Sequence, residues 1–330
     1  MPTVDLRAQR ANYTPPVVDI VMEPEPIQTE APRVPTGEDP FFPVSIRPLI
    51  SLINPEHEIS HTNGDLQAIV GERGAVEDPA YIIAVHGDRY TLVSNRMVVS
   101  AYETAIERAK QNPAYSEVFS KLDNPFIHTA TPNNGGRMFR SYYYPRTEAM
   151  LLNMWPVGFE VRLINSYDGS SKTGLIAGAR FKHNNVSIPL VQRNSTIRSF
   201  GKHTANINLY AIMNAIHSAF TSFQESLGSM RDLIQRPVTQ LQINELIDNE
   251  PKFAADHVAQ AIRSGVRSCS REVGNNWFAV YMALSNWASN PQYMGPASRP
   301  NAESIRLRRE ADIQRIMTRP SFGLVENNHV

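Results

Sequence analysis

A short segment of the chain combines positive charges with flat aromatic rings in an order that suits an unpaired nucleic-acid strand. Residues 137–146 read Arg-Met-Phe-Arg-Ser-Tyr-Tyr-Tyr-Pro-Arg. Because side chains alternate between the two faces of an extended strand, Tyr142 and Tyr144 share one face. Arg140 and Arg146 flank them on that face. Cations hold phosphates and aromatic rings stack on unpaired bases, so the pattern favours single-stranded nucleic acid as the ligand. The alternative is a tyrosine-rich strand that packs inward with arginines at its rim.

Cations of the following segments extend this candidate surface. Residues 137–203 carry ten Lys/Arg and three acidic side chains, an excess that indicates a polyanionic partner. A solvated basic face is the plainer explanation of the same charge. The side chains expected to contact phosphates are Arg137, Arg140, Arg162, Lys172, Arg180, Lys182, Arg198 and Lys202.

A polar turn follows the strand that contains Arg162. Residues 165–171 read Asn-Ser-Tyr-Asp-Gly-Ser-Ser, which is a dense turn signal. We expect the turn to shape the candidate surface and His203 to support it. Three roles stay open: a structural turn, a set of backbone N–H groups for a phosphate, or catalysis with Asp168. The residues assigned to this supporting turn are Asn165, Asp168, Gly169, Ser170 and His203.

Two histidine patterns raise the question of a metal. The residues His57-Glu58-Ile-Ser-His61 match the H-E-x-x-H pattern of zinc proteases. Pro55 and Gly64 interrupt any helix there, and His183, His203 and His217 have no common metal-ligand spacing. We therefore expect no catalytic residue, no metal and no cofactor. A metal-dependent hydrolase or nuclease that uses Asp168 and the histidines is the alternative from another class.

Composition defines the broad class. The 330 residues carry 32 basic and 32 acidic side chains, but residues 1–45 carry seven acids and only three bases. Nine prolines interrupt residues 1–44, which predicts a disordered acidic tail. No apolar run approaches the roughly 18 residues of a membrane span. The absence of a leader argues against secretion, and the single Cys269 excludes an internal disulfide.

The remaining pattern predicts a small sheet followed by helices. Residues 81–85 and 90–93 read as a hairpin around His86, and a capping box at Ser100 and Glu103 predicts a helix to about residue 111. Residues 160–165 and 175–183 read as neighbouring antiparallel strands around the polar turn.

Apolar residues at heptad spacing predict a long helix over residues 209–234, ended by Pro237. Its apolar side has three candidate partners: the sheet, another helix or another subunit. Further helices are expected over residues 240–248, 251–268, 276–289 and 302–317.

The order of these landmarks resembles the phage/plasmid-like family called domain of unknown function 932. The resemblance is carried by Asp-Arg-Tyr at 88–90, Leu-Val-Ser-Asn-Arg at 92–96, the polar turn, Gly-Ala-Arg-Phe at 178–181, and Lys-His-Thr at 202–204. The helix at 276–285 completes it. It implies an origin in a mobile element and no defined reaction. The layout of a small sheet against a long helix is similar to that of single-strand annealing proteins, an analogy of fold alone.

Together these observations predict an α+β fold. A small curved antiparallel sheet packs on a long helix over residues 45–236, a helical part covers residues 237–330, and residues 1–44 form the tail. The expected function is binding of single-stranded DNA in phage replication, recombination or transcription, in the host cytoplasm. The alternative is an accessory factor that recruits a phage polymerase or replication proteins. The expected assembly is a homo-oligomer without a membrane partner.

Overall fold

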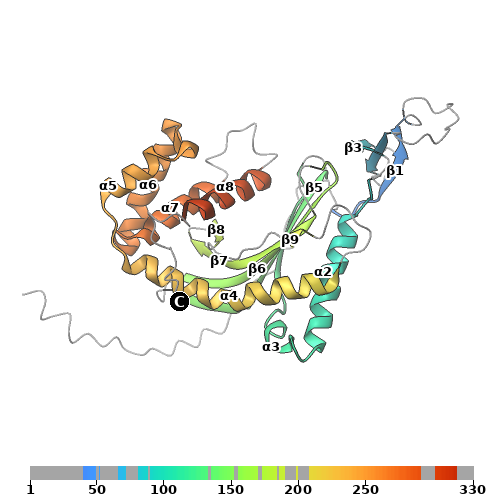
Figure 1. Ribbon diagram of the computed structural model, residues 1–330, viewed down its shortest axis with the longest axis horizontal. Coiled ribbons are helices and arrows are strands. Elements are labelled where there is room, and N and C mark those ends of the chain that lie inside the picture. The colour runs from blue at the N-terminus through green and yellow to red at the C-terminus, as the bar shows by residue number, and fades with distance from the viewer. Residues whose placement is uncertain are drawn as a thin grey trace, which may run out of the picture. The chain divides into compact units, whose positions relative to one another are not determined.

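Three long antiparallel strands form the centre of the fold (Figure 1). The structure is a computed structural model that describes residues 40–49, 52, 66–71, 81–87, 90–132, 135–151, 155–169, 173–183, 186–189, 198–199, 208–290 and 302–317. The central strands are β5 (Arg137–Leu151), β6 (Trp155–Ser166) and β7 (Gly174–His183). The larger sheet has the order β4-β5-β6-β7-β8, where β4 is Phe126–Ala130 and β8 is Val186–Pro189. A short strand, β9 (Arg198–Ser199), also pairs with β7. The sequence correctly predicted the antiparallel pairing of β6 and β7.

Helix α4 (Leu209–Gln235) is the long helix that the heptad spacing predicted, and it covers one face of this sheet, one of its three candidate partners. Phe159 of β6 points to this face, and its ring centroid lies 5.1 Å from that of Phe220 and 6.3 Å from that of Phe223. The apolar side of α4 is therefore part of the core of this chain. Another subunit was one of the candidate partners of this apolar side. That prediction is corrected, because the apolar side chains of α4 are buried within this chain.

Helix α2 (Asn95–Gln111) begins five residues before the predicted capping box. The Ser94 side chain accepts a hydrogen bond from the Met97 backbone N–H at 3.1 Å and so caps the helix earlier than Ser100. Ser100 is an exposed residue inside the helix. A single turn, α3 (Ser116–Phe119), follows.

A second sheet contains β1 (Val44–Pro48), β2 (Gln67–Gly71) and β3 (Tyr81–His86) in that order. The predicted hairpin between residues 81–85 and 90–93 is wrong. β3 pairs with β2 instead, because β2 supplies a buried apolar strand, while residues 90–93 run without strand pairing to the start of α2. Tyr90 stacks on His86 with a centroid distance of 4.0 Å.

Helices dominate the C-terminal part, as expected. They are α5 (Gln240–Asp248), the 3-10 turn η1 (Pro251–Phe253), α6 (Asp256–Val273), α7 (Trp277–Ser289) and α8 (Ala302–Met317). Almost every side chain of α7 is buried, since this helix lies among the others and contacts both α4 and β8. The protein is thus an α+β fold. Among the described residues, no helix is both long and apolar enough to span a membrane. The predicted tail lies outside the described residues except for residues 40–44.

Candidate nucleic-acid interface

The tyrosines expected to stack on bases are buried. Tyr142 and Tyr144 are each 2% exposed. The Tyr144 hydroxyl lies 2.5 Å from the Tyr102 hydroxyl of α2, and the Tyr142 hydroxyl donates to Glu103 at 3.2 Å. Burial raises the pKa of Tyr142 and of Tyr144 above the ordinary value. The prediction that these rings stand on an exposed face is therefore wrong, because α2 covers the face that they share.

Arg140 lies on the same face as these rings and contacts them within the protein. Its Nε donates to the Tyr142 hydroxyl at 2.8 Å and its Nη1 donates to Thr129 Oγ1 at 2.9 Å. The guanidinium group also lies 5.4 Å from the Phe41 ring centroid. The expected row of alternating cations and aromatic rings therefore packs inside the protein. This is the alternative interpretation, in which the tyrosines of the strand pack inward and arginine lies at the rim.

Arg162 and Arg180 lie on the opposite face of the sheet from Arg140. Arg140 is the register partner of Leu163, and Arg162 is the partner of Ser141, so the two arginines point to opposite sides. Arg162 is 2% exposed and Arg180 is 5% exposed. The cations assigned to one surface are therefore divided between two faces.

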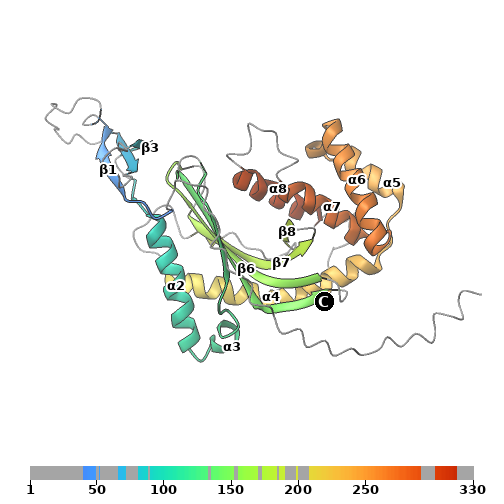
Figure 2. The same cartoon turned by 180° about the vertical axis from the view of Figure 1, so that it is seen from behind.

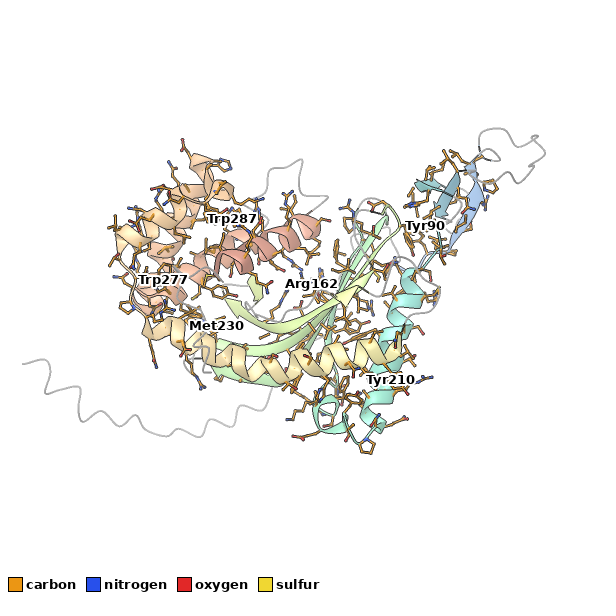
Figure 3. All side chains as sticks on the ribbon, viewed as in Figure 1. Tyr90, Arg162, Tyr210, Met230, Trp277 and Trp287 are labelled. Carbon is orange, nitrogen blue, oxygen red and sulfur yellow. The ribbon has the colours of Figure 1, made fainter. Side chains whose placement is uncertain are left out.

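A group of six charged side chains, here called the ion network, joins β6 and β7 to α8. The two sheet arginines contact Glu160: Arg180 Nε lies 2.6 Å from Glu160 Oε2, and Arg162 Nη2 lies 3.3 Å from Oε1. Arg162 Nη1 also lies 3.1 Å from Glu310 Oε2 of α8. Figure 3 shows Arg162 on the side of the sheet that faces α8. The members of the ion network are Arg162, Arg180, Arg306, Glu160, Glu303 and Glu310.

Burial and the neighbouring charges shift the pKa values of the ion network in opposite directions. Burial alone would lower the pKa of Arg162, but the carboxylates of Glu310 and Glu160 outweigh it and hold the pKa above the ordinary value. Burial raises the pKa of Glu160, and Arg162 and Arg306 oppose that shift. The arginine thus stays fully charged at neutral pH, and its charge is balanced inside the protein.

The polar turn is clamped by hydrogen bonds to several parts of the fold. Asp168 accepts from Arg137 Nε at 2.9 Å and from the Ser166 hydroxyl at 2.6 Å. The fully buried Asn165 donates to the Val93 carbonyl at 3.0 Å and to Asn95 Oδ1 at 2.8 Å. The turn therefore holds the start of α2 against the end of β6, which favours its structural role.

Residues that were not assigned to the supporting turn complete this junction. The Asn95 backbone N–H donates to the Tyr167 hydroxyl at 2.7 Å, and the Thr173 hydroxyl donates to Asn165 Oδ1 at 2.7 Å. Gly169 has φ of +70°, a left-handed conformation that favours glycine. The short polar side chains around an Asp-Gly pair were the available signal for such a junction.

The other expected contact residues cannot be placed by their side chains. Lys182 lies on β7 and Arg198 lies on β9, and the structure describes only the backbone of these two residues. Those that lie outside the described residues are Lys172, Lys202, Ser170 and His203.

A metal site finds no support in the part of the chain that the structure describes. No group of three His, Cys, Asp or Glu side chains there is arranged to hold an ion. The residues His57 and His61 lie outside the described ranges. Asp168, the proposed base of the hydrolase alternative, is engaged by Arg137 and Ser166.

Comparison with models of known protein families, with curated proteins and with solved structures found no match. The resemblance to the domain of unknown function 932 family stays a hypothesis from sequence motifs.

Proposed function

We propose that this chain binds single-stranded DNA along the edge of the larger sheet where β8 and β9 pair with β7. The family resemblance implies an origin in a mobile element, and phage DNA replication, recombination or transcription is the setting that we propose. The site differs from the one that the sequence suggested on β5, because the tyrosines and arginines there are engaged internally.

One observation carries the proposal. Residues 169–224 contain no Asp or Glu but contain six Lys/Arg. Arg180 is balanced by the ion network. The remaining cations, here called the basic edge, are Lys172, Lys182, Arg193, Arg198 and Lys202.

The placement of these residues favours an elongated polyanion. Lys182 is on β7 and pairs in register with Ser187 of β8, while Arg198 on β9 pairs with Leu175 near the other end of β7. The two members of the basic edge whose backbone the structure describes, Lys182 and Arg198, therefore lie toward opposite ends of β7. Phosphates repeat along a nucleic-acid strand, so a strand that follows this edge passes both positions.

Tyr210 supplies an aromatic ring close in sequence to the basic edge. It lies in the first turn of α4, and its side chain is 67% exposed (Figure 3). An exposed ring is a platform for an unpaired base, the role that buried Tyr142 and Tyr144 cannot fill.

Titration of a fluorescent thymidine oligonucleotide over a salt series tests the proposal. We expect affinity to fall steeply as salt rises, because each phosphate contact releases bound counterions. The double variant Lys182→Gln and Arg198→Gln should weaken binding about tenfold or more and flatten the salt dependence by about two contacts. Arg231→Gln, an exposed cation on α4, is the matched control and should change little.

Tyr210 provides an independent readout of base stacking. Tyr210→Ala should lose about 1–3 kcal/mol of binding free energy, whereas Tyr210→Phe keeps the ring and should retain it. Equal binding by the Lys182/Arg198 variant and the control, or no binding by the wild type at any salt, would refute the proposed function.

A further inference from the structure

Three guanidinium groups converge on one carboxylate of α8. Glu310 receives Arg162 at 3.1 Å, Arg306 at 3.5 Å and Arg180 at 3.8 Å. Two of these arginines belong to the sheet, on the face opposite the one that packs against α4. Figure 2 shows α4 and α8 on opposite sides of the β6 and β7 ribbons. Guanidinium groups bind carboxylate and phosphate oxygens by the same forked geometry. Glu310 therefore occupies a position that suits an oxyanion.

The beginning and the end of α8 are held in place by different kinds of contact. Its buried side chains are Ile313, Ile316 and Met317, all in the C-terminal half. Residues 302–307 are only partly buried, and their described contacts to the sheet are polar, such as Arg137 Nη1 donating to the Ser304 hydroxyl at 2.7 Å. Apolar packing thus anchors residues 313–317, while the described contacts of residues 302–310 with the sheet are polar or ionic.

The ionic contact leaves polar atoms incompletely satisfied. Glu303 Oε2, Arg306 Nε and Glu310 Oε1 are buried and lie in ion pairs, yet none of them makes a hydrogen bond of good geometry. Buried polar atoms without hydrogen bonds destabilise the arrangement that buries them. The closed position of residues 302–310 of α8 is therefore less stable than the number of ion pairs suggests.

We propose that Arg162 and Arg180 form a second phosphate-binding site for the DNA strand, which Glu310 occupies until residues 302–310 of α8 move away. This inference rests on the proposed function. The basic edge receives the strand first, and the strand then competes with Glu310 for the two sheet arginines. α8 thereby reduces affinity in the closed state, because only the open fraction offers the second site.

Glu310→Gln tests this competition in the full-length protein. The substitution keeps the shape of the side chain and removes its charge. We expect the affinity for the thymidine oligonucleotide to rise about tenfold, with a salt dependence steeper by one to two phosphate contacts. Asp312→Asn is the matched control, because Asp312 lies on the same helix and pairs with Lys252 and Arg315 outside the ion network. It should change affinity less than about twofold.

Adding Arg162→Gln to the Glu310→Gln variant should remove the gain, since it removes half of the second site. Equal effects of Glu310→Gln and Asp312→Asn, in a protein whose binding still depends on Lys182 and Arg198, would overturn the second site and leave the proposed function standing. Absence of binding in the wild type and all variants would overturn both.

Hydrogen exchange on the wild-type protein gives a test that needs no substitution. Oligonucleotide binding should speed amide exchange in residues 302–310 several-fold and leave residues 311–317 protected. Unchanged exchange in residues 302–310 at saturating oligonucleotide would refute the movement of α8.

Discussion

At the scale of single residues, burial changes the chemistry that side-chain type suggests. Tyr142, Tyr144 and Arg162 belong to types that bind nucleic acid, yet they are almost completely buried here. Each has a partner in another element: Glu103 and Tyr102 in α2, and Glu310 in α8. These side chains therefore hold the sheet between its two covering helices.

The Tyr102 and Tyr144 hydroxyls should show energetic coupling. Tyr102→Phe or Tyr144→Phe alone leaves the other hydroxyl buried without its partner, so each should lower the free energy of unfolding by about 1–3 kcal/mol. The double variant should lose clearly less than the sum of the two. Urea unfolding curves measure all three, with Tyr115→Phe as a control whose hydroxyl contacts Asn214 in an exposed position. Simple additivity would contradict the coupling.

Cys269 should react slowly in the native protein. Burial, and secondarily the Glu272 carboxylate, raises the pKa of its thiol to about 11. At pH 8 the thiolate fraction is then roughly 100-fold below that of an ordinary cysteine. Modification by iodoacetamide should be slower by at least that factor in native protein than in urea, and should speed up as pH rises toward 11.

The same pKa shift has a defined effect on stability. The folded state keeps the thiol proton when the unfolded chain has already lost it, so the thiol's contribution to stability should decline as pH rises from about 9 to 11. Fast native labelling at pH 8 would show that the thiol is accessible and contradict both expectations.

At the scale of elements, α6 and α7 pack closely because a glycine faces an alanine. A Cβ added at Gly265 of α6 would lie 3.2 Å from the Ala283 Cβ of α7. α7 is apolar on all sides and needs neighbours around its whole circumference. The small pair permits one of these neighbours to approach closely.

Gly265→Val should therefore destabilise the protein by about 1–3 kcal/mol, since the larger side chain forces the two helices apart. Gly228→Ala in α4 is the opposite case, because no neighbouring atom of the described residues lies within 4 Å of its added Cβ. This control should stabilise by about 0.5–1 kcal/mol through helix propensity. Chemical denaturation compares the two, and a Gly265→Val protein as stable as the wild type would contradict the close packing.

At the scale of the whole molecule, zero net charge conceals an uneven distribution. The acidic residues of the first 45 positions offset cations elsewhere, and residues 169–224 contain no acid at all. The described cations of residues 137–180 mostly have acidic partners inside the fold, such as Asp168, Glu160 and Glu310. The basic edge is where positive charge is not balanced by neighbours in sequence, so the DNA-binding prediction belongs there.

Local pattern determined the elements of this protein. Runs of β-forming residues predicted β6 and β7, the heptad spacing predicted α4, and α5, α7 and α8 lie within one residue of their expected bounds. The helix expected over residues 251–268 is instead the 3-10 turn η1 followed by α6, which ends at Val273. These elements depend on side chains two, three or four positions apart, which a sequence displays directly. The start of α2 was predicted too late, because Ser94 caps the helix before Ser100. The expected hairpin was wrong because β3 pairs with β2, which lies earlier in the chain.

Tertiary structure alone decided the character of each sheet face. Period-two alternation places Tyr142 and Tyr144 on one side of β5, but it contains no information on whether a helix covers that side. Only the positions of α2 and α8, far away in sequence, bury the tyrosines and bring Glu310 to Arg162. The charge of a surface depends on which acidic side chains lie close to it in space. Those distances are set only when the chain folds.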